Sequence, residues 1–250
     1  MKQDELQNHF FTTYINVRTG IAIVGVALPF LLWWGGLLVG IEWQNSISAY
    51  YHAGTAQYSM RNFFVGGLFI IGALLYLYKG YSLMENIFLN IAGAAAVGVA
   101  LFPMEWVDGN GRTVYEAIYL FGKVSLHGFC AVVAFIFIAL VCFFCANDTL
   151  HLLEDEQKKK RYQLWYRIIG ILMIVLPLVA SFLALVLQIS NKTIFIIETV
   201  GMVVFVAYWL VKGIEIRSTN AEQQAAAGAL QVENALSNTV LRWTGVQAAS

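Results

Sequence analysis

The sequence contains six long apolar stretches, and they constrain the fold more than any other feature. They cover residues 21–41, 62–78, 87–103, 124–146, 168–189 and 194–211. Crossing the hydrocarbon core of a bilayer takes roughly 20 apolar residues, and fewer where the bilayer thins. Continuous apolar runs, unlike short alternating segments, indicate helices, which satisfy their own backbone hydrogen bonds in lipid. We therefore predict an all-α, polytopic membrane protein whose six transmembrane helices form one bundle.

The third apolar stretch is rich in small residues. Ala92, Ala96 and Ala100 repeat every four positions, so their side chains share one face of the predicted helix. Small side chains on one face allow a second helix to approach closely in lipid. This pattern predicts a close helix contact along the alanine face.

Composition and charge exclude several classes of soluble protein. Charged residues make up 12% of the 250-residue chain, against about a quarter in a typical soluble domain. The formal net charge is zero, which leaves no basic face to neutralise nucleic-acid phosphates. The three cysteines lie between positions 130 and 145 and cannot form the disulfide framework of a small secreted protein. The expected partners are membrane lipids.

The apolar stretches divide the chain into three parts. Residues 1–20 carry aromatic and leucine side chains at helical spacing and predict a cytoplasmic interfacial segment. Residues 21–217 form the predicted transmembrane domain. Residues 218–250 are rich in alanine and glutamine and predict a cytoplasmic tail. No signal peptide is indicated, because the first apolar stretch begins only after residue 20.

The distribution of lysine and arginine predicts the orientation. With six spans, eleven of the 15 Lys and Arg residues fall on the side of the two termini, and four fall on the opposite side. Cytoplasmic loops carry the excess of positive charge in membrane proteins. We therefore expect a multi-pass protein of the cell membrane with both termini in the cytoplasm.

Polar residues gather on the predicted outer side. The outer loops, residues 42–61 and 104–123, are long, aromatic and polar, and a turn signal at 108–111 predicts a short helix that re-enters the bilayer near Lys123. His127 and Glu198 fall within the outer ends of their spans, where an ionisable group normally faces a partner or a water-filled cavity. The inner halves show no comparable set. The pattern predicts a polar cleft that opens to the extracytoplasmic side.

The predicted ligand-binding residues are charged and belong to this outer side. They are Glu42, Arg61, Glu105, Asp108, Arg112, Lys123 and Glu198. Arg61 and Arg112 would contact an anionic headgroup, since arginine is the usual partner of phosphate. Glu198 is equally well explained as an interhelical ion pair with Lys123 or Arg61.

A second pattern suggests a metal. Ser48 and His52 share a face if their segment is helical. Together with His127 and a carboxylate they could bind Zn²⁺ and leave a coordination position for water. Ser48, His52 and His127 are therefore candidate catalytic residues. The two histidines, His52 and His127, are also candidate metal ligands. His127 is also explained as a hydrogen-bonded interhelical residue. No cofactor is expected, and zinc belongs only to the hydrolase alternative. The residues define no specific Ser-His-Asp triad.

Three segments carry a resemblance to known families. The segments SISAYYH at 46–52, RNFFVG at 61–66 and VALFP at 99–103 resemble a bacterial six-helix membrane family described as a domain of unknown function. More remotely, the layout is similar to the autophagy-modulator and GPI-lipid-remodelling membrane families. Ser48 and His52 also resemble the early Ser-x-x-x-His of the membrane hydrolases that include alkaline ceramidases, although the chain lacks their late His-x-x-x-His. The resemblance implies an integral membrane protein and supplies no catalytic residue.

These observations support three hypotheses for function. The first is a membrane protein whose outward polar cleft binds a lipid headgroup or small amphiphile. The second is a metal-dependent membrane lipid hydrolase. The third is a small-solute transporter, which requires a polar pathway that the predicted inner halves do not offer.

Overall fold

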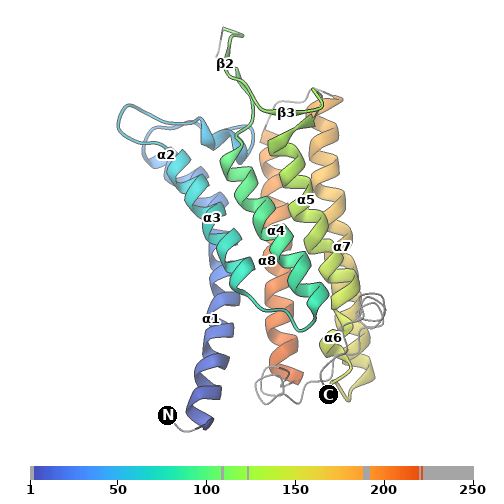
Figure 1. The fold of residues 1–250 in the computed structure, drawn as a ribbon. Coiled ribbons are helices and arrows are strands. Elements are labelled where there is room, and N and C mark those ends of the chain that lie inside the picture. The colour runs from blue at the N-terminus through green and yellow to red at the C-terminus, as the bar shows by residue number, and fades with distance from the viewer. Residues whose placement is uncertain (1–2, 108–109, 123, 188–191, 220, 222–250) are drawn as a thin grey trace.

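The structure is a computed structural model and consists mainly of helices (Figure 1). It describes residues 3–107, 110–122, 124–187, 192–219 and 221. The α-helices are α1 (Gln3–Phe30), α2 (Gly36–Leu38), α3 (Arg61–Leu77), α4 (Leu83–Leu101), α5 (Leu126–Leu140), α6 (Asn147–Leu150), α7 (Glu156–Leu185) and α8 (Lys192–Thr219). Two π-helical turns, η1 (Leu31–Gly35) and η3 (Val141–Cys145), extend α1 and α5, and η2 (Ser48–Tyr51) is a short 3₁₀ helix. The strands are β1 (Trp106–Val107), β2 (Thr113–Tyr115), β3 (Tyr119–Leu120) and β4 (Val124–Ser125).

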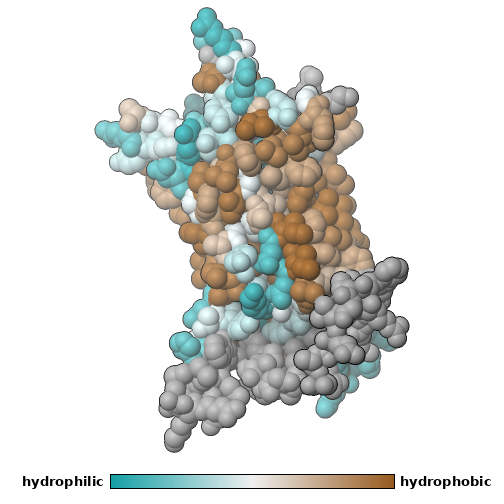
Figure 2. Space-filling view, in the orientation of Figure 1, coloured by the Kyte–Doolittle hydropathy of each residue, from teal (hydrophilic) through white to brown (hydrophobic). Residues whose placement is uncertain are grey.

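Five helical segments are long and apolar enough to cross a membrane. They are Thr12–Leu38, Leu83–Leu101, Leu126–Leu150, Glu156–Ala184 and Lys192–Thr219. The remaining predicted span, α3, is apolar but has only 17 residues, so its length does not confirm a count of six. On the face that Figure 2 shows, apolar residues cover most of the middle of the bundle, and hydrophilic loops lie above it. The structure is compatible with an integral membrane protein.

The long helices are arranged as a ring. Each packs mainly against its neighbours in sequence, in the order α1, α3, α4, α5, α7 and α8, and α8 closes the ring against α1 (Figure 1). We call the end that carries the long loops 39–60 and 102–125 the loop end, and the opposite end, where α6 lies, the α6 end. Helix α1 continues from the N-terminal segment directly into the first apolar stretch.

Two glycines allow close contact between the backbones of α3 and α4. A Cβ atom on Gly72 of α3 would lie 2.8 Å from the carbonyl oxygen of Gly93 in α4, and the reverse substitution meets the same obstacle. The predicted alanine face has a different role, since Ala92 and Ala96 are buried and line a cavity inside the ring. The two glycines therefore bring α3 and α4 together, while the alanines keep the interior open.

The two loops at the loop end have distinct structures. Loop 39–60 contains η2 and contacts both sides of the ring, whereas the second loop forms the antiparallel strand pairs β1–β2 and β3–β4. The short re-entrant helix predicted after residue 111 is wrong. Thr113, Val114 and Tyr115 are β-branched or aromatic and favour the extended chain found there.

Substitution of Gly72 by leucine should destabilise the bundle. The new side chain would collide with the backbone of α4 and should cost about 1–3 kcal/mol, the usual range for overpacking. Gly66 in the same helix has open space at its Cβ position, so Gly66→Leu is the matched control. Thermal unfolding of the detergent-purified variants measures the difference. Equal melting temperatures for the two variants would contradict this account of the α3–α4 contact.

Candidate functional site

The long helices line an apolar cavity with a volume of about 310 Å³. All six long helices contribute to its wall, with apolar side chains such as Leu28, Phe64, Ala96, Ile138 and Phe205. Five polar side chains also line it: Ser48, Ser125, His127, Ser181 and Glu198. Small-molecule sites in proteins range from about 300 to 1,000 Å³ and are mostly apolar with a few placed polar groups. The cavity meets both criteria.

Glu198 fastens loop 39–60 to the ring. Its Oε2 accepts a hydrogen bond of 2.5 Å from the backbone N–H of Ile47, at the start of η2. One turn earlier in α8, the N–H of Phe195 donates to the carbonyl of Asn45 at 2.9 Å. The ammonium group of Lys192 donates to the carbonyl of Trp43. The first turns of α8 thus hold residues 43–47 through three contacts.

The expected ion pair of Glu198 is not formed with Arg61, the one of its two predicted partners that the structure describes. Arg61 Nε donates instead to the carbonyl of Tyr51 at 3.2 Å, and its guanidinium lies 4.4 Å from the centre of the Tyr51 ring. Lys123, the other predicted partner, lies outside the described residues. The observed role of Glu198 is to accept from the loop backbone.

His127 joins the same loop to the opposite side of the ring. Its Nε2 is 2.9 Å from Ser48 Oγ, and its Nδ1 is 2.9 Å from the carbonyl oxygen of Phe102 and 3.2 Å from that of Val99. Carbonyl oxygens only accept, so Nδ1 carries the hydrogen and Nε2 accepts from the Ser48 hydroxyl. Ser125 caps α5 by accepting from the N–H of Gly128 at 3.1 Å, which sets the helix turn that holds His127.

His52 lies near this pair but bonds elsewhere. Its Nε2 donates to the carbonyl of Met104 at 2.9 Å, and its ring stacks on Trp106 with 5.1 Å between the centres. Burial lowers the pKa of His52 below its usual value, the Met104 bond opposes this shift, and the positive charge of Arg61 adds to it. His52 therefore stays neutral at pH 7 and connects the two loops.

The other predicted ligand residues that the structure describes do not line the cavity. Glu42 and Arg112 are exposed. Glu105 is exposed as well and accepts from the Tyr119 hydroxyl at 2.9 Å, and this bond raises the pKa of Tyr119. Asp108 lies outside the described residues. Of the predicted set, Ser48, His127 and Glu198 are brought together at the cavity, whereas the described charges of the two loops lie outside its wall.

The zinc site suggested for His52 and His127 stays a prediction. Within the described ranges, no group of three or more His, Cys, Asp or Glu side chains is placed to hold a metal ion. Both ring nitrogens of His127 are already hydrogen-bonded, and the described nitrogen contact of His52 is to a carbonyl oxygen. A metal would have to displace these bonds.

A buried polar cluster at the α6 end was missed by the sequence analysis. Lys212 Nζ lies 3.1 Å from Glu215 Oε2 and donates to Thr149 Oγ1 at 2.8 Å. Thr149 and Tyr166 in turn donate to the two oxygens of Glu215, at 2.6 and 2.7 Å. We call these four residues the α6-end cluster, and all four are at most 1% exposed.

The expectation that the inner halves lack polar groups is therefore wrong. Lys212 and Glu215 follow the apolar stretch 194–211, and α8 continues past that stretch to Thr219. Glu85 is also fully buried, in the first turn of α4. Hydropathy ends a span where the first charges appear, so it assigned these residues to the aqueous side. The only available signal was the i, i+3 spacing of Lys212 and Glu215, which also occurs on exposed helices.

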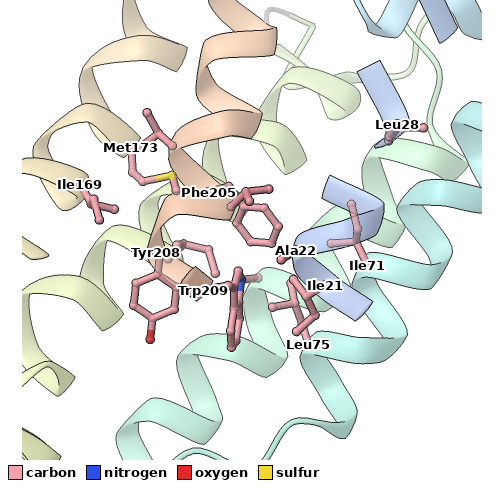
Figure 3. Close-up of a cluster of buried hydrophobic side chains, with 14 of the residues drawn as sticks. Ile21, Ala22, Leu28, Ile71, Leu75, Ile169, Met173, Phe205, Tyr208 and Trp209 are labelled. Carbon is pink, nitrogen blue, oxygen red and sulfur yellow. The ribbon is translucent and has the colours of Figure 1, made fainter. Parts of the chain in front are cut away.

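An aromatic layer separates the cavity from the α6-end cluster. Trp209 lies at the centre of this layer, 5.0 Å from Tyr78, 5.1 Å from Tyr208 and 6.3 Å from Phe205 between ring centres. Figure 3 shows Phe205 and Trp209 of α8 packed toward Ile21 of α1 and Leu75 of α3. These buried rings lie next to Phe205, which lines the cavity, and on the side of the α6-end cluster.

No family model, curated protein or solved structure is significantly similar to this chain.

Removal of the Lys212 ammonium should strongly destabilise the protein. Lys212→Met leaves the Glu215 carboxylate buried without its cation, and breaking a buried pair in this way costs about 3–5 kcal/mol. Lys160 is exposed on α7, so Lys160→Met is the matched control and should unfold like the wild type. Thermal unfolding in detergent tests the difference. A Lys212→Met variant as stable as the control would show that the cluster does not hold α8 in place.

Proposed function

We propose that this protein is a six-span integral membrane protein that binds an amphiphilic lipid in its central cavity. The single observation that carries the proposal is the form of the cavity, which is apolar over most of its wall and polar at Ser48, His127 and Glu198. The acyl part of a lipid would occupy the apolar wall, and its ester or headgroup would meet the polar side chains. The proposal follows because the apolar and polar parts of the cavity wall match the apolar and polar parts of such a lipid.

The wall of the cavity suits an acyl chain. The helices contribute leucine, isoleucine, valine, alanine and phenylalanine side chains, and the serines are few. Burying apolar surface gains roughly 25 cal/mol per Å², and the cavity supplies no array of polar groups for a hydrated solute. An empty apolar cavity of this size also weakens a bundle, because its lining atoms lose their packing partners. An apolar occupant restores those contacts.

The polar end of the cavity suits a neutral or zwitterionic group more than an anion. Glu198 brings a carboxylate, and among the described residues no lysine or arginine side chain lines the cavity. The two arginines expected to hold a phosphate lie elsewhere, with Arg61 bonded to Tyr51 and Arg112 exposed on the second loop. We infer that an ester or hydroxyl lies at Ser48 and His127, and that a phosphate, where present, stays outside.

The proposed orientation places the loop end outside the cell. It rests on the charge distribution, because lysine and arginine are concentrated at the α6 end and in the segments next to it. The short α3 completes the ring between α1 and α4, which favours its being a sixth span in spite of its length. Both termini are then cytoplasmic.

Labelling of introduced cysteines tests this orientation. Tyr58 is 52% exposed in loop 39–60, and Glu154 is exposed between α6 and α7. Tyr58→Cys should react with a membrane-impermeant maleimide in intact cells, and Glu154→Cys should react only after permeabilisation. The wild-type protein is the blank: Cys142 and Cys145 are buried, and any reaction of the partly buried Cys130 is subtracted as background. The opposite labelling pattern would reverse the proposed topology.

Filling the cavity should remove the lipid. Ala96 lines the cavity, whereas Ala94 in the same helix is exposed on the outside of the bundle. In nanodiscs that contain a phosphatidylethanolamine with a diazirine on its acyl chain, irradiation of the wild type should label cavity-lining residues. Ala96→Phe should lose these interior adducts, and Ala94→Phe should keep them. Mass spectrometry of the peptides locates the adducts.

Two outcomes would contradict lipid binding in the cavity. One is a wild-type protein whose adducts are confined to lipid-facing positions. The other is an Ala96→Phe variant, folded by thermal unfolding, that keeps every interior adduct.

A further inference from the structure

We propose that Ser48 is a nucleophile activated by His127, and that it accepts an acyl group from an ester-linked lipid bound in the cavity. This inference rests on the proposed function, because the cavity must first admit the lipid. It adds a reaction class, acyl transfer and ester hydrolysis, and it needs no metal. The observations that carry it are the hydrogen bond between the two side chains, the fixed tautomer of the imidazole and their joint position on the cavity wall.

The two side chains have the geometry of a nucleophile and its general base. Ser48 Oγ and His127 Nε2 are 2.9 Å apart, within the range over which a base can take a hydroxyl proton. Nδ1 is bonded to the carbonyls of Phe102 and Val99. These bonds place the hydrogen on Nδ1 and leave the lone pair of Nε2 directed at the Ser48 hydroxyl. The imidazole is thus held in the tautomer that a base requires.

The surroundings restrict both groups to this contact. His127 is only 8% exposed, and its ring is bonded on both sides. Ser48 begins η2, next to Ile47, whose N–H is held by Glu198. Glu198 therefore acts as a positioning residue, because it fixes the backbone that carries Ser48 and does not itself contact the hydroxyl. A base held this firmly loses little free energy to reorganisation during the reaction.

The position of the pair matches the ester of a lipid. Ser48 and His127 both line the cavity, and the rest of the wall is almost entirely apolar. An acyl chain that lies along the apolar wall brings its own carbonyl carbon to the polar side chains at the end of that wall. The two carbonyl oxygens next to Nδ1 also stabilise the positive charge that the imidazole acquires when it takes the proton.

The reaction balances without another reactant except water. Ser48 Oγ bonds to the ester carbonyl carbon while His127 Nε2 takes the hydroxyl proton. The tetrahedral intermediate then expels the alcohol, as the carbon–oxygen bond to the alcohol breaks and the imidazolium returns its proton to the leaving oxygen. This leaves an acyl ester on Ser48. Water, deprotonated by Nε2, attacks that ester, releases a carboxylic acid and restores the serine. No electron is gained or lost overall.

A long-chain alkyl fluorophosphonate provides the test, because it traps activated serines covalently. We expect the wild-type protein in nanodiscs to gain one phosphonyl adduct, and peptide mass spectrometry should place it on Ser48. Ser48→Ala should gain none. His127→Gln should react about 100- to 10,000-fold more slowly, the usual contribution of a general base. Ser59→Ala is the matched control, since Ser59 is an exposed serine of the same loop outside the cavity wall, and it should react like the wild type.

The outcomes separate this inference from lipid binding. A wild-type protein that gains interior diazirine adducts but no phosphonyl adduct on Ser48 binds lipid without an activated serine, and the inference is then wrong. An adduct on another serine, or equal rates in wild type and His127→Gln, would also overturn it. Loss of both kinds of adduct would remove the proposed function together with the inference. Mapping the adduct in the wild type decides the question even if Ser48→Ala is unstable.

Discussion

The bond between the Glu198 carboxylate and the Ile47 N–H is the interaction on which the arrangement of the site depends. A carboxylate within a membrane-spanning helix is costly unless it is hydrogen-bonded, and here the partner is the backbone of a loop. The same bond satisfies the start of η2, whose first N–H groups have no partner within the short helix. The Glu198 carboxylate and the Ile47 N–H thus satisfy each other's hydrogen-bonding requirement, and neither pays the cost of burial without a partner. Loop 39–60 is consequently tied to α8 at the point where Ser48 enters the cavity.

The ring explains why the interior remains open. Each long helix packs against two neighbours and leaves the centre unfilled. Gly72 and Gly93 permit backbone contact between α3 and α4, while Ala92 and Ala96 place only methyl groups on the inner side. Larger side chains at those two alanines would fill the centre. Small residues therefore serve two separate purposes in α4, one at its contact with α3 and the other at the cavity.

Sequence reasoning recovered the class of fold because hydropathy depends only on composition over about 20 residues. It also pointed to His127 and Glu198, since ionisable residues inside an apolar stretch stand out. It grouped Ser48 with His127 only as part of a possible zinc site, and it could not predict their direct hydrogen bond, because these residues are 79 positions apart and their contact depends on how the loop crosses the ring. The α6-end cluster was missed for a related reason. Lys212 and Glu215 stand where an apolar stretch ends, and only packing shows that they are buried.

The two polar clusters also constrain how the molecule can move. Glu198 and Lys212 are 14 residues apart on α8, about 21 Å along a helix that rises about 1.5 Å per residue. Glu198 holds loop 39–60 at one end, and Lys212 and Glu215 hold α6 and α7 at the other. A shift of α8 along its axis would break both sets of bonds at once and leave buried charges without partners.

The rings of Phe205, Tyr208 and Trp209, which lie between the two clusters, are carried by the same helix. With α8 fixed at both ends, the aromatic rings that it carries between the two clusters stay in place. The proposed lipid binding and acyl transfer leave α8 in this position, whereas a passage through the bundle would require α8 to release both clusters.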